Sequence, residues 1–185
     1  EATQELLITV GGEATLEHWP DPLILHAGAD YRQRAVLRLS SRARALFADV
    51  VAAGRLERGE RHQYRRYVSE IELWCDDRLL AADRAWIEPG RDRPTSGVAA
   101  GRFGLWATVL GFNEALVDIP RTLVGEALER AGARVRMAAS VPCPGVVAAR
   151  VLAETAWEMV EALRALQDIL RPVVVGKGTP RLRKL

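Results

Sequence analysis

Cysteine is scarce in this chain. Its 185 residues include only Cys75 and Cys143, so at most one disulfide could form within it. Small secreted domains depend on several disulfides, whereas proteins of reducing compartments keep their thiols free. We therefore exclude a disulfide framework and expect two unpaired thiols in a cytoplasmic protein.

Long hydrophobic runs are also lacking. The longest uncharged stretch, 137–149, contains Pro142 and Pro144 and is shorter than the roughly 20 residues that a transmembrane helix needs. No signal-peptide pattern is visible, although the sequence begins at Glu1 rather than at a methionine. We expect no membrane as a partner.

Neither sign of charge dominates. The chain has 26 Lys and Arg residues against 24 Asp and Glu residues, which gives a formal net charge of +2. Proteins that bind nucleic acid usually carry a strong positive field over one face. The arginine-rich stretch 55–66 is diluted by Glu57 and Glu60, so we expect no nucleic-acid partner.

Known catalytic motifs are missing. The five serines and three histidines include no Gly-x-Ser-x-Gly nucleophile motif, and no spacing favours a cysteine–histidine pair. The turn Gly176-Lys177-Gly178-Thr179 is not a phosphate-binding loop, because Arg171 stands where that motif needs glycine. We predict that the protein is not an enzyme.

The histidines leave one metal-binding hypothesis open. His18 and His26 flank the turn Pro20-Asp21-Pro22, and a tight turn there could bring the two imidazoles together. The chain has no Cys-x-x-Cys, His-x-x-x-His or His-x-His motif. Histidines at the surface or at the edge of the core are the interpretation that we favour.

The first half of the chain is predicted to form strands. Residues 31–39 alternate apolar side chains with arginines, which is typical of a half-exposed strand. The segment 45–53 also resembles a strand, although its alanines leave a helix open. Short segments bounded by turn residues are predicted as strands at 5–10, 14–19, 23–25, 31–39, 45–53, 64–74, 79–87, 103–112, 134–141 and 146–152. The segment 90–101, rich in Gly, Pro, Arg and Asp, is predicted as a surface loop.

Helices are predicted only after residue 112. Apolar residues recur at helical spacing in 121–131 and in 154–170, with Arg164 and Asp168 placed to pair on the polar face of the second helix. Arg171-Pro172 is expected to end that helix. Strands grouped before helices argue against an alternating βαβ fold. The predicted fold class is mainly β, with two α-helices toward the C-terminus.

Four segments, in order along the chain, resemble the UreD family of urease accessory proteins, called UreH in some organisms. They are Leu16-Glu17-His18-Trp19-Pro20-Asp21-Pro22-Leu23-Ile24 continuing into Arg32-Gln33-Arg34; Gly54-Arg55 with Arg58-Gly59-Glu60-Arg61; Glu72-Leu73-Trp74-Cys75-Asp76-Asp77-Arg78-Leu79-Leu80 with Asp83-Arg84; and Arg150-Val151-Leu152-Ala153 with Leu170-Arg171-Pro172 and Pro180-Arg181. The tail departs from the family, which usually has an aromatic residue after Pro-Arg.

The resemblance implies stacked, β-helix-like sheets in a single UreD-like domain, 1–185, that lacks the family's usual N-terminal segment. It also implies a scaffold that binds apo-urease and recruits UreF, and through UreF the GTPase UreG, for nickel insertion. The alternative is an unrelated β-rich binding or enzymatic domain.

The same resemblance implies that nickel passes through without any stably bound cofactor. A route with weak oxygen ligands would let the ion enter and leave. Glu60 and Asp83 are candidate stations, and the alternative is that they are ion-pair partners of Arg61 and Arg84. On the last helix, Trp157 and Met159 are candidates for contact with UreF, because interfaces favour aromatic residues and methionine. Met159 lies on the apolar stripe and could instead pack into the core.

Overall fold

The computed structural model describes residues 1–92, 94, 101–115, 125, 129 and 134–179. In this part of the chain, strands predominate. The strands are β1 (Ala2–Val10), β2 (Thr15–His18), β3 (Leu23–Ile24), β4 (Asp30–Leu39), β5 (Arg44–Ala52), β6 (Arg66–Cys75), β7 (Arg78–Ile87), β8 (Leu105–Asn113), β9 (Val135–Ser140) and β10 (Val146–Ala153). The helices are the 3-10 helix η1 (Leu56–Arg58), α1 (Pro89–Asp92) and α3 (Ala156–Val174).

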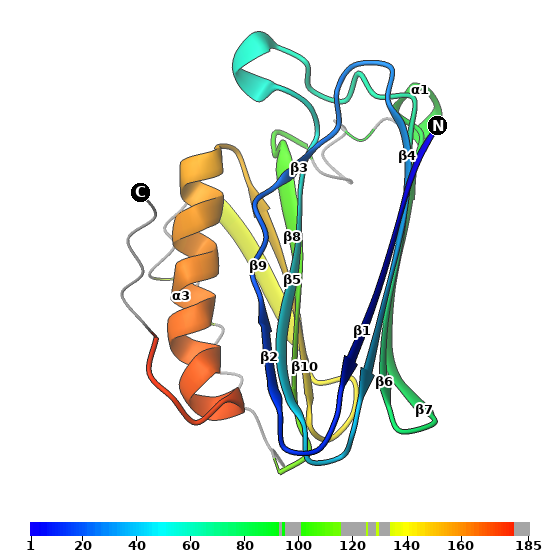
Figure 1. Cartoon of the computed structure of the whole chain (residues 1–185). Coiled ribbons are helices and arrows are strands. Elements are labelled where there is room, and N and C mark those ends of the chain that lie inside the picture. Colours follow the sequence, from blue (N-terminus) through cyan, green and yellow to red (C-terminus); the bar gives the residue numbers. More distant parts are fainter. Residues whose placement is uncertain (93, 95–100, 116–124, 126–128, 130–133, 180–185) are drawn as a thin grey trace.

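The strands form two sheets that face each other (Figure 1). The first, which we call sheet A, has the order β1-β4-β6-β7. The second, sheet B, has the order β2-β5-β8-β10-β9, and β3 also pairs with β5. β1, β4 and β6 are parallel, as are β2, β3 and β5. The other neighbours are antiparallel.

The parallel part of the molecule is wound like a β-helix. From β1 in sheet A the chain crosses to β2 and β3 in sheet B, returns as β4, crosses again to β5 and returns as β6. Parallel neighbours usually need a long crossover, and here each crossover is a strand of the opposite sheet. The mainly β fold predicted from the sequence is confirmed, and so are the stacked sheets that the family resemblance implies.

The alternation of β4 separates its two faces as predicted. Gln33, Leu37 and Leu39 point into the space between the sheets and are buried, whereas Arg32 and Arg38 are exposed. The side chains that fill this space come from both sheets, which therefore share one apolar core. The segment 45–53 forms strand β5, not a helix, because its small apolar residues pack on both faces of sheet B.

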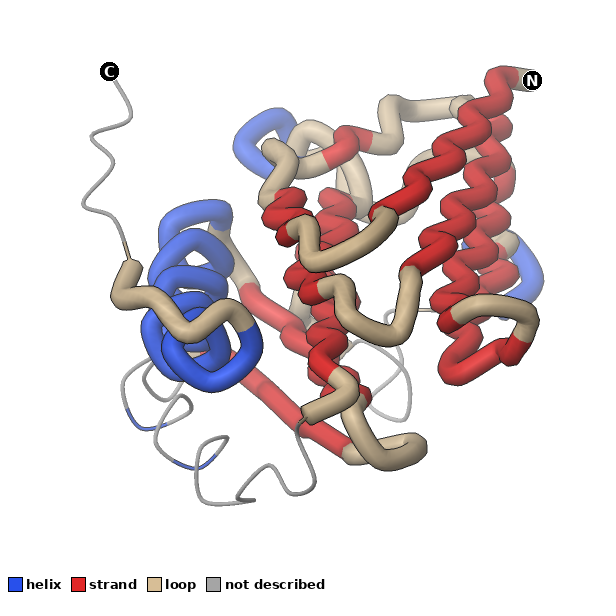
Figure 2. The backbone as a smooth tube through the Cα atoms, turned by 60° about the horizontal axis from the view of Figure 1, so that its bottom comes forward, coloured by secondary structure: helices blue, strands red, loops and turns tan. Residues whose placement is uncertain are grey.

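Helix α3 covers the outer face of sheet B, and Figure 2 shows it lying beside that sheet. It begins with a capping box, in which the Thr155 hydroxyl accepts from the Glu158 backbone N–H and the Glu158 carboxylate accepts from the Thr155 N–H. Its apolar stripe, including Leu166 and Leu170, is buried against the alanines and valines of the sheet. None of the described helices is long and apolar enough to cross a membrane.

Some predicted helical features need correction. α3 continues through Pro172 to Val174. Because Pro172 has no N–H, the last turn lacks one backbone hydrogen bond, and the burial of Val174 offsets that loss. Arg164 pairs with Glu161, three residues earlier, and not with Asp168. The segment predicted as a loop at 90–101 begins with part of the short helix α1. The helix predicted at 121–131 lies, apart from residues 125 and 129, outside the described residues.

Candidate functional site: a polar seam between the sheets

Polar side chains meet inside the otherwise apolar space between the sheets. Gln33 on β4 lies with its Nε2 2.8 Å from Oδ2 of Asp49 on β5, and 2.9 Å from the hydroxyl oxygens of both Tyr67 and Ser69 on β6. Buried polar groups are stable only when they are hydrogen-bonded, and these satisfy one another. We call this cluster, together with the neighbouring Thr108, Asp83 and Arg150, the polar seam.

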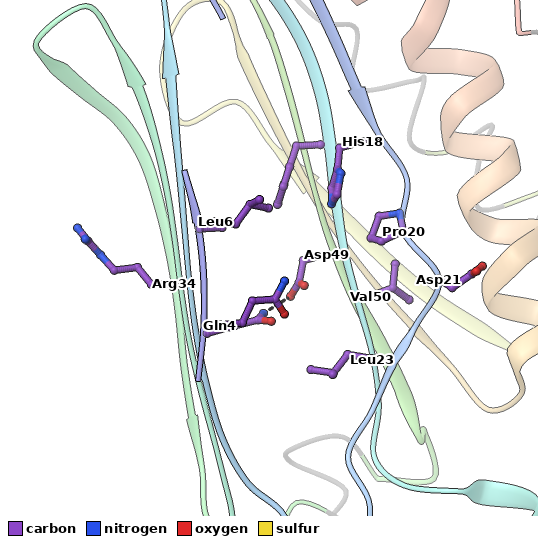
Figure 3. Close-up of a pocket in the computed structure, with 12 residues that line it drawn as sticks. Gln4, Leu6, His18, Pro20, Asp21, Leu23, Arg34, Asp49 and Val50 are labelled. Carbon is purple, nitrogen blue, oxygen red and sulfur yellow. Dashed lines mark hydrogen bonds between the residues drawn. The ribbon is translucent and has the colours of Figure 1, made fainter. Parts of the chain in front are cut away.

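Asp49 is the acidic centre of the seam. Figure 3 shows its side chain pointing from β5 into a cavity, while Arg34 points away from it. Burial raises the pKa of the Asp49 carboxyl, and the hydrogen bonds from Gln33 and Tyr67 oppose that rise only in part. Among the described residues, no cationic side chain forms an ion pair with Asp49. Its carboxyl group lines the cavity and accepts hydrogen bonds from neutral donors.

The seam continues across sheet B. Thr108 on β8 stands directly opposite Asp49 in the β5–β8 register, and Arg150 on β10 stands opposite Thr108. The Thr108 hydroxyl donates to Oδ2 of Asp83 on β7, at 2.6 Å, and Asp83 forms an ion pair with Arg150. Two carboxylates, Asp49 and Asp83, therefore lie on either side of one threonine.

Two cavities open onto the seam from opposite edges of the sandwich. The first, about 260 Å³, is lined by Gln4 and Leu6 of β1, by the β2–β3 segment, and by Gln33 and Asp49. The second, about 310 Å³, lies between β7 and the strands β8, β9 and β10, and Asp83 lines it. Since β1 and β2 form one edge of the two sheets and β7 and β9 the other, the seam lies between the two cavities.

Of the two acidic residues singled out in the sequence, only Asp83 belongs to the seam. Its side chain is 16% exposed and pairs with Arg150, not with Arg84, which pairs with Glu70. A neighbour in sequence on a strand points to the opposite face, so Arg84 could not be its partner. Asp83 therefore faces the interior.

Glu60 lies outside the seam. It forms a two-point ion pair with Arg55, which lowers the pKa of the Glu60 carboxyl, and Arg61 instead donates to the Arg102 carbonyl. The loop that carries this pair needs its glycines. A Cβ on Gly54 would lie 1.6 Å from the Glu60 carbonyl oxygen. Glu60 is held by this loop structure, which favours the ion-pair interpretation for it.

The two histidines of the metal-binding hypothesis have separate surroundings. His18 stacks on Phe47, with ring centroids 5.0 Å apart, and lines the first cavity, where burial lowers its pKa. His26 is exposed beyond β3. In the described part of the chain, no group of three or more His, Cys, Asp or Glu residues could hold a metal ion. Cys75 and Cys143 are free thiols.

The candidate contact residues on α3 differ in exposure. Trp157, in the first turn, is 69% exposed, whereas Met159 is fully buried in the core beneath sheet B. Met159 lies on the stripe that faces the sheet, so its side chain is not offered to a partner. A surface role on this helix therefore rests on Trp157 alone.

Sequence reasoning missed Asp49. The only signal was one acidic residue in the middle of the apolar segment 45–53, where a strand buried on both faces would be expected to carry none. The partners that make it a site, Gln33 and Thr108, are far from it in the sequence.

Comparison with known proteins gives one consistent result. The family model described as UreD urease accessory protein matches residues 1–184. Urease accessory protein UreD of Haloarcula marismortui is 32% identical over 188 residues, which cover 99% of this chain and 61% of that protein. UreD 2 of Streptomyces griseus subsp. griseus is 30% identical (99% and 64%), and UreD of Opitutus terrae is 31% identical (98% and 65%). The chain thus spans less than two thirds of the length of these relatives.

Proposed function

Because this chain belongs to the UreD family of urease accessory proteins, we propose that it serves urease maturation as a non-catalytic scaffold that passes nickel between its two sheets. The family match over nearly the whole chain overturns the alternative of an unrelated β-rich domain. In the proposed role the protein binds apo-urease and recruits UreF, and UreG through UreF. Nickel is its cargo and not a resident cofactor.

The observation that carries the nickel proposal is the polar seam, which lies between two cavities. It contains Asp49, whose carboxyl group has no cationic partner among the described residues. A divalent cation can leave water only where negative charge and oxygen ligands replace its hydration shell. Asp49 supplies the charge. The hydroxyl oxygens of Tyr67 and Ser69, which contact the same Gln33 amide nitrogen as Asp49 does, are neutral oxygen ligands nearby.

Weak ligation suits transfer better than storage. Thiolate and imidazole ligands bind Ni²⁺ and its competitor Cu²⁺ tightly, so a route rich in them would hold an ion instead of passing it on. The described seam has carboxylate, amide and hydroxyl groups, and His18 lines the first cavity without belonging to the seam. These groups would let nickel bind briefly and move on.

Urease activation in cells tests this role. The full-length protein would be co-expressed with urease subunits, UreF and UreG, and the nickel content and activity of the purified urease would be measured. Replacing both seam carboxylates, Asp49→Asn with Asp83→Asn, should lower urease activation severely, while pull-down of urease and UreF stays unchanged. Asp77→Asn, in the exposed turn between β6 and β7, is the matched control. Full activation by the folded double variant would rule out the seam as the route, and loss of both pull-downs would indicate a purely structural effect.

A further inference from the structure

The ion pair between Asp83 and Arg150 spans the two sheets at the second cavity. Asp83 belongs to β7 of sheet A, and Arg150 belongs to β10 of sheet B. The carboxylate side chain is 16% exposed, whereas the arginine side chain is 69% exposed. Arg150 therefore reaches from the solvent side onto a carboxylate that faces inward.

Arg150 also lines two neighbouring cavities. With Thr108, it lines the second cavity and, in addition, a third cavity of about 280 Å³ that Trp106 and Ile87 help to enclose. Among the described residues, Arg150 is the only cationic side chain that lines either of these two cavities. A cation in either cavity would therefore lie near a positive charge.

A guanidinium and a divalent cation compete for the same carboxylate oxygens. Arginine stays charged at every physiological pH, so its ion pair with Asp83 is not weakened by loss of a proton from the guanidinium. Because its side chain is largely exposed, the ion pair can break at little cost in free energy, and the guanidinium can move into water. Asp83 would then keep the hydrogen bond from Thr108 and lose its positive partner.

We propose that Arg150 is an internal counter-ion that occupies Asp83 in the free protein and so keeps the second cavity closed to divalent cations. This inference rests on the proposed nickel passage and adds a resting, closed state to it. Among the described residues Asp49 has no such counter-ion, so the two carboxylates differ: one is open to a cation at rest, and the other becomes open only when Arg150 leaves.

Nickel binding by the purified, untagged protein tests the inference. Ni²⁺ affinity would be measured by competition with a chromophoric chelator for the wild type, Arg150→Gln, Arg150→Lys and the double variant Arg150→Gln/Asp83→Asn. Arg150→Gln should bind Ni²⁺ on the order of tenfold more tightly, since a neighbouring positive charge is removed. Arg150→Lys retains the charge and should bind as the wild type does. Arg164→Gln, in an exposed ion pair on α3, is the control and should change nothing.

Two results would overturn the inference. One is an Arg150→Gln protein that binds Ni²⁺ no more tightly than the wild type, and the other is a double variant that keeps the gain. Thermal unfolding of each variant would show that it is folded, and Arg150→Ala can take the place of an Arg150→Gln protein that is not.

The test of the closed state and the test of the nickel passage can succeed or fail independently. These affinities are measured on the isolated protein without urease. If replacing both carboxylates leaves urease activation intact, the passage is refuted, yet the affinity of Arg150→Gln still decides whether Arg150 occupies Asp83. If activation depends on the carboxylates but Arg150→Gln shows no gain, the passage stands and the closed state falls.

Discussion

Arg171, near the end of α3, donates two hydrogen bonds to the carboxylate of Glu17 on β2, from Nε at 2.7 Å and from Nη2 at 2.9 Å. The arginine side chain is 12% exposed, so the pair is partly shielded from water. This two-point contact joins the last described helix to an early strand of sheet B and raises the pKa of the Arg171 guanidinium.

Ion pairs of this kind also occur among the other segments that resemble the UreD family. Glu17 and Arg171 come from the first and fourth of these segments, and Asp83 and Arg150 come from the third and fourth. Arg55 and Glu60 pair within the second. The charged residues of segments that are far apart in sequence are therefore partners in space, which gives a physical reason for their joint occurrence in this chain.

Replacing Arg171 by Met should destabilise the protein, because Glu17 would keep its charge in a partly buried site without a partner. The control is Arg164→Met, which breaks an exposed ion pair with Glu161 and should change the free energy of unfolding by no more than about 0.5 kcal/mol. Urea unfolding would compare the two. Equal losses for both variants would show that the Arg171–Glu17 contact adds nothing beyond an ordinary surface pair.

Gly54→Ala should be severely destabilising. The backbone at Gly54 has φ +144°, and an added Cβ would lie 1.6 Å from a backbone oxygen of Glu60, so the loop must rearrange. We expect a loss of about 3 kcal/mol or more in the free energy of unfolding. Gly28→Ala is the matched control, because its φ of +75° is also left-handed but nothing lies within 4 Å. That variant should lose about 1 kcal/mol. A Gly54→Ala protein as stable as Gly28→Ala would contradict the loop geometry.

The two α3 residues should respond in opposite ways. Trp157→Ala should leave stability within about 0.5 kcal/mol of the wild type, since the side chain is mostly exposed. If Trp157 is a hot spot for UreF, capture of UreF should weaken by on the order of 2 kcal/mol. Unchanged capture by this folded variant would remove Trp157 from the interface.

Met159→Ala should instead lose about 2–5 kcal/mol of stability, because it empties a fully buried position beneath sheet B. Thermal unfolding and urea titration would measure the loss. A change below about 1 kcal/mol would mean that the helix packs less closely on the sheet than the structure indicates.

Asp49→Asn should stabilise the protein at neutral pH. Burial raises the pKa of Asp49 in the folded state above its value in the unfolded chain. The folded protein therefore holds this proton at pH values where the unfolded chain has lost it, and the associated stability disappears as pH rises through the folded pKa. Asparagine keeps an oxygen that can accept from Gln33 and carries no charge at any pH.

The difference in melting temperature between Asp49→Asn and the wild type should therefore grow from pH 3 to pH 7, in favour of the variant. Asp77→Asn, in an exposed turn, should show no comparable trend. A difference that stays constant with pH would argue that the raised pKa of Asp49 does not contribute to stability.

Local patterns by themselves determined the strands of this fold and most of helix α3. The alternation in 31–39 predicted strand β4, and the helical spacing in 154–170 predicted most of α3, because strand and helix periodicities are set by neighbours a few residues apart. The break between the predicted strands 64–74 and 79–87 fell at the β6–β7 turn for the same reason. The buried stripe of α3, which includes Met159, followed from spacing as well.

Only the tertiary structure decided which charges meet. Asp83 pairs with Arg150 instead of Arg84, and Glu60 pairs with Arg55 instead of Arg61, because partners depend on loop conformation, on strand register and on which sheet each crossover enters. Asp49 became the centre of a polar seam for the same reason. Its hydrogen-bond donor comes from the opposite sheet and its cross-strand neighbour from β8. Periodicity places a side chain on a face of its strand, but the long-range stacking of the two sheets determines what lies opposite.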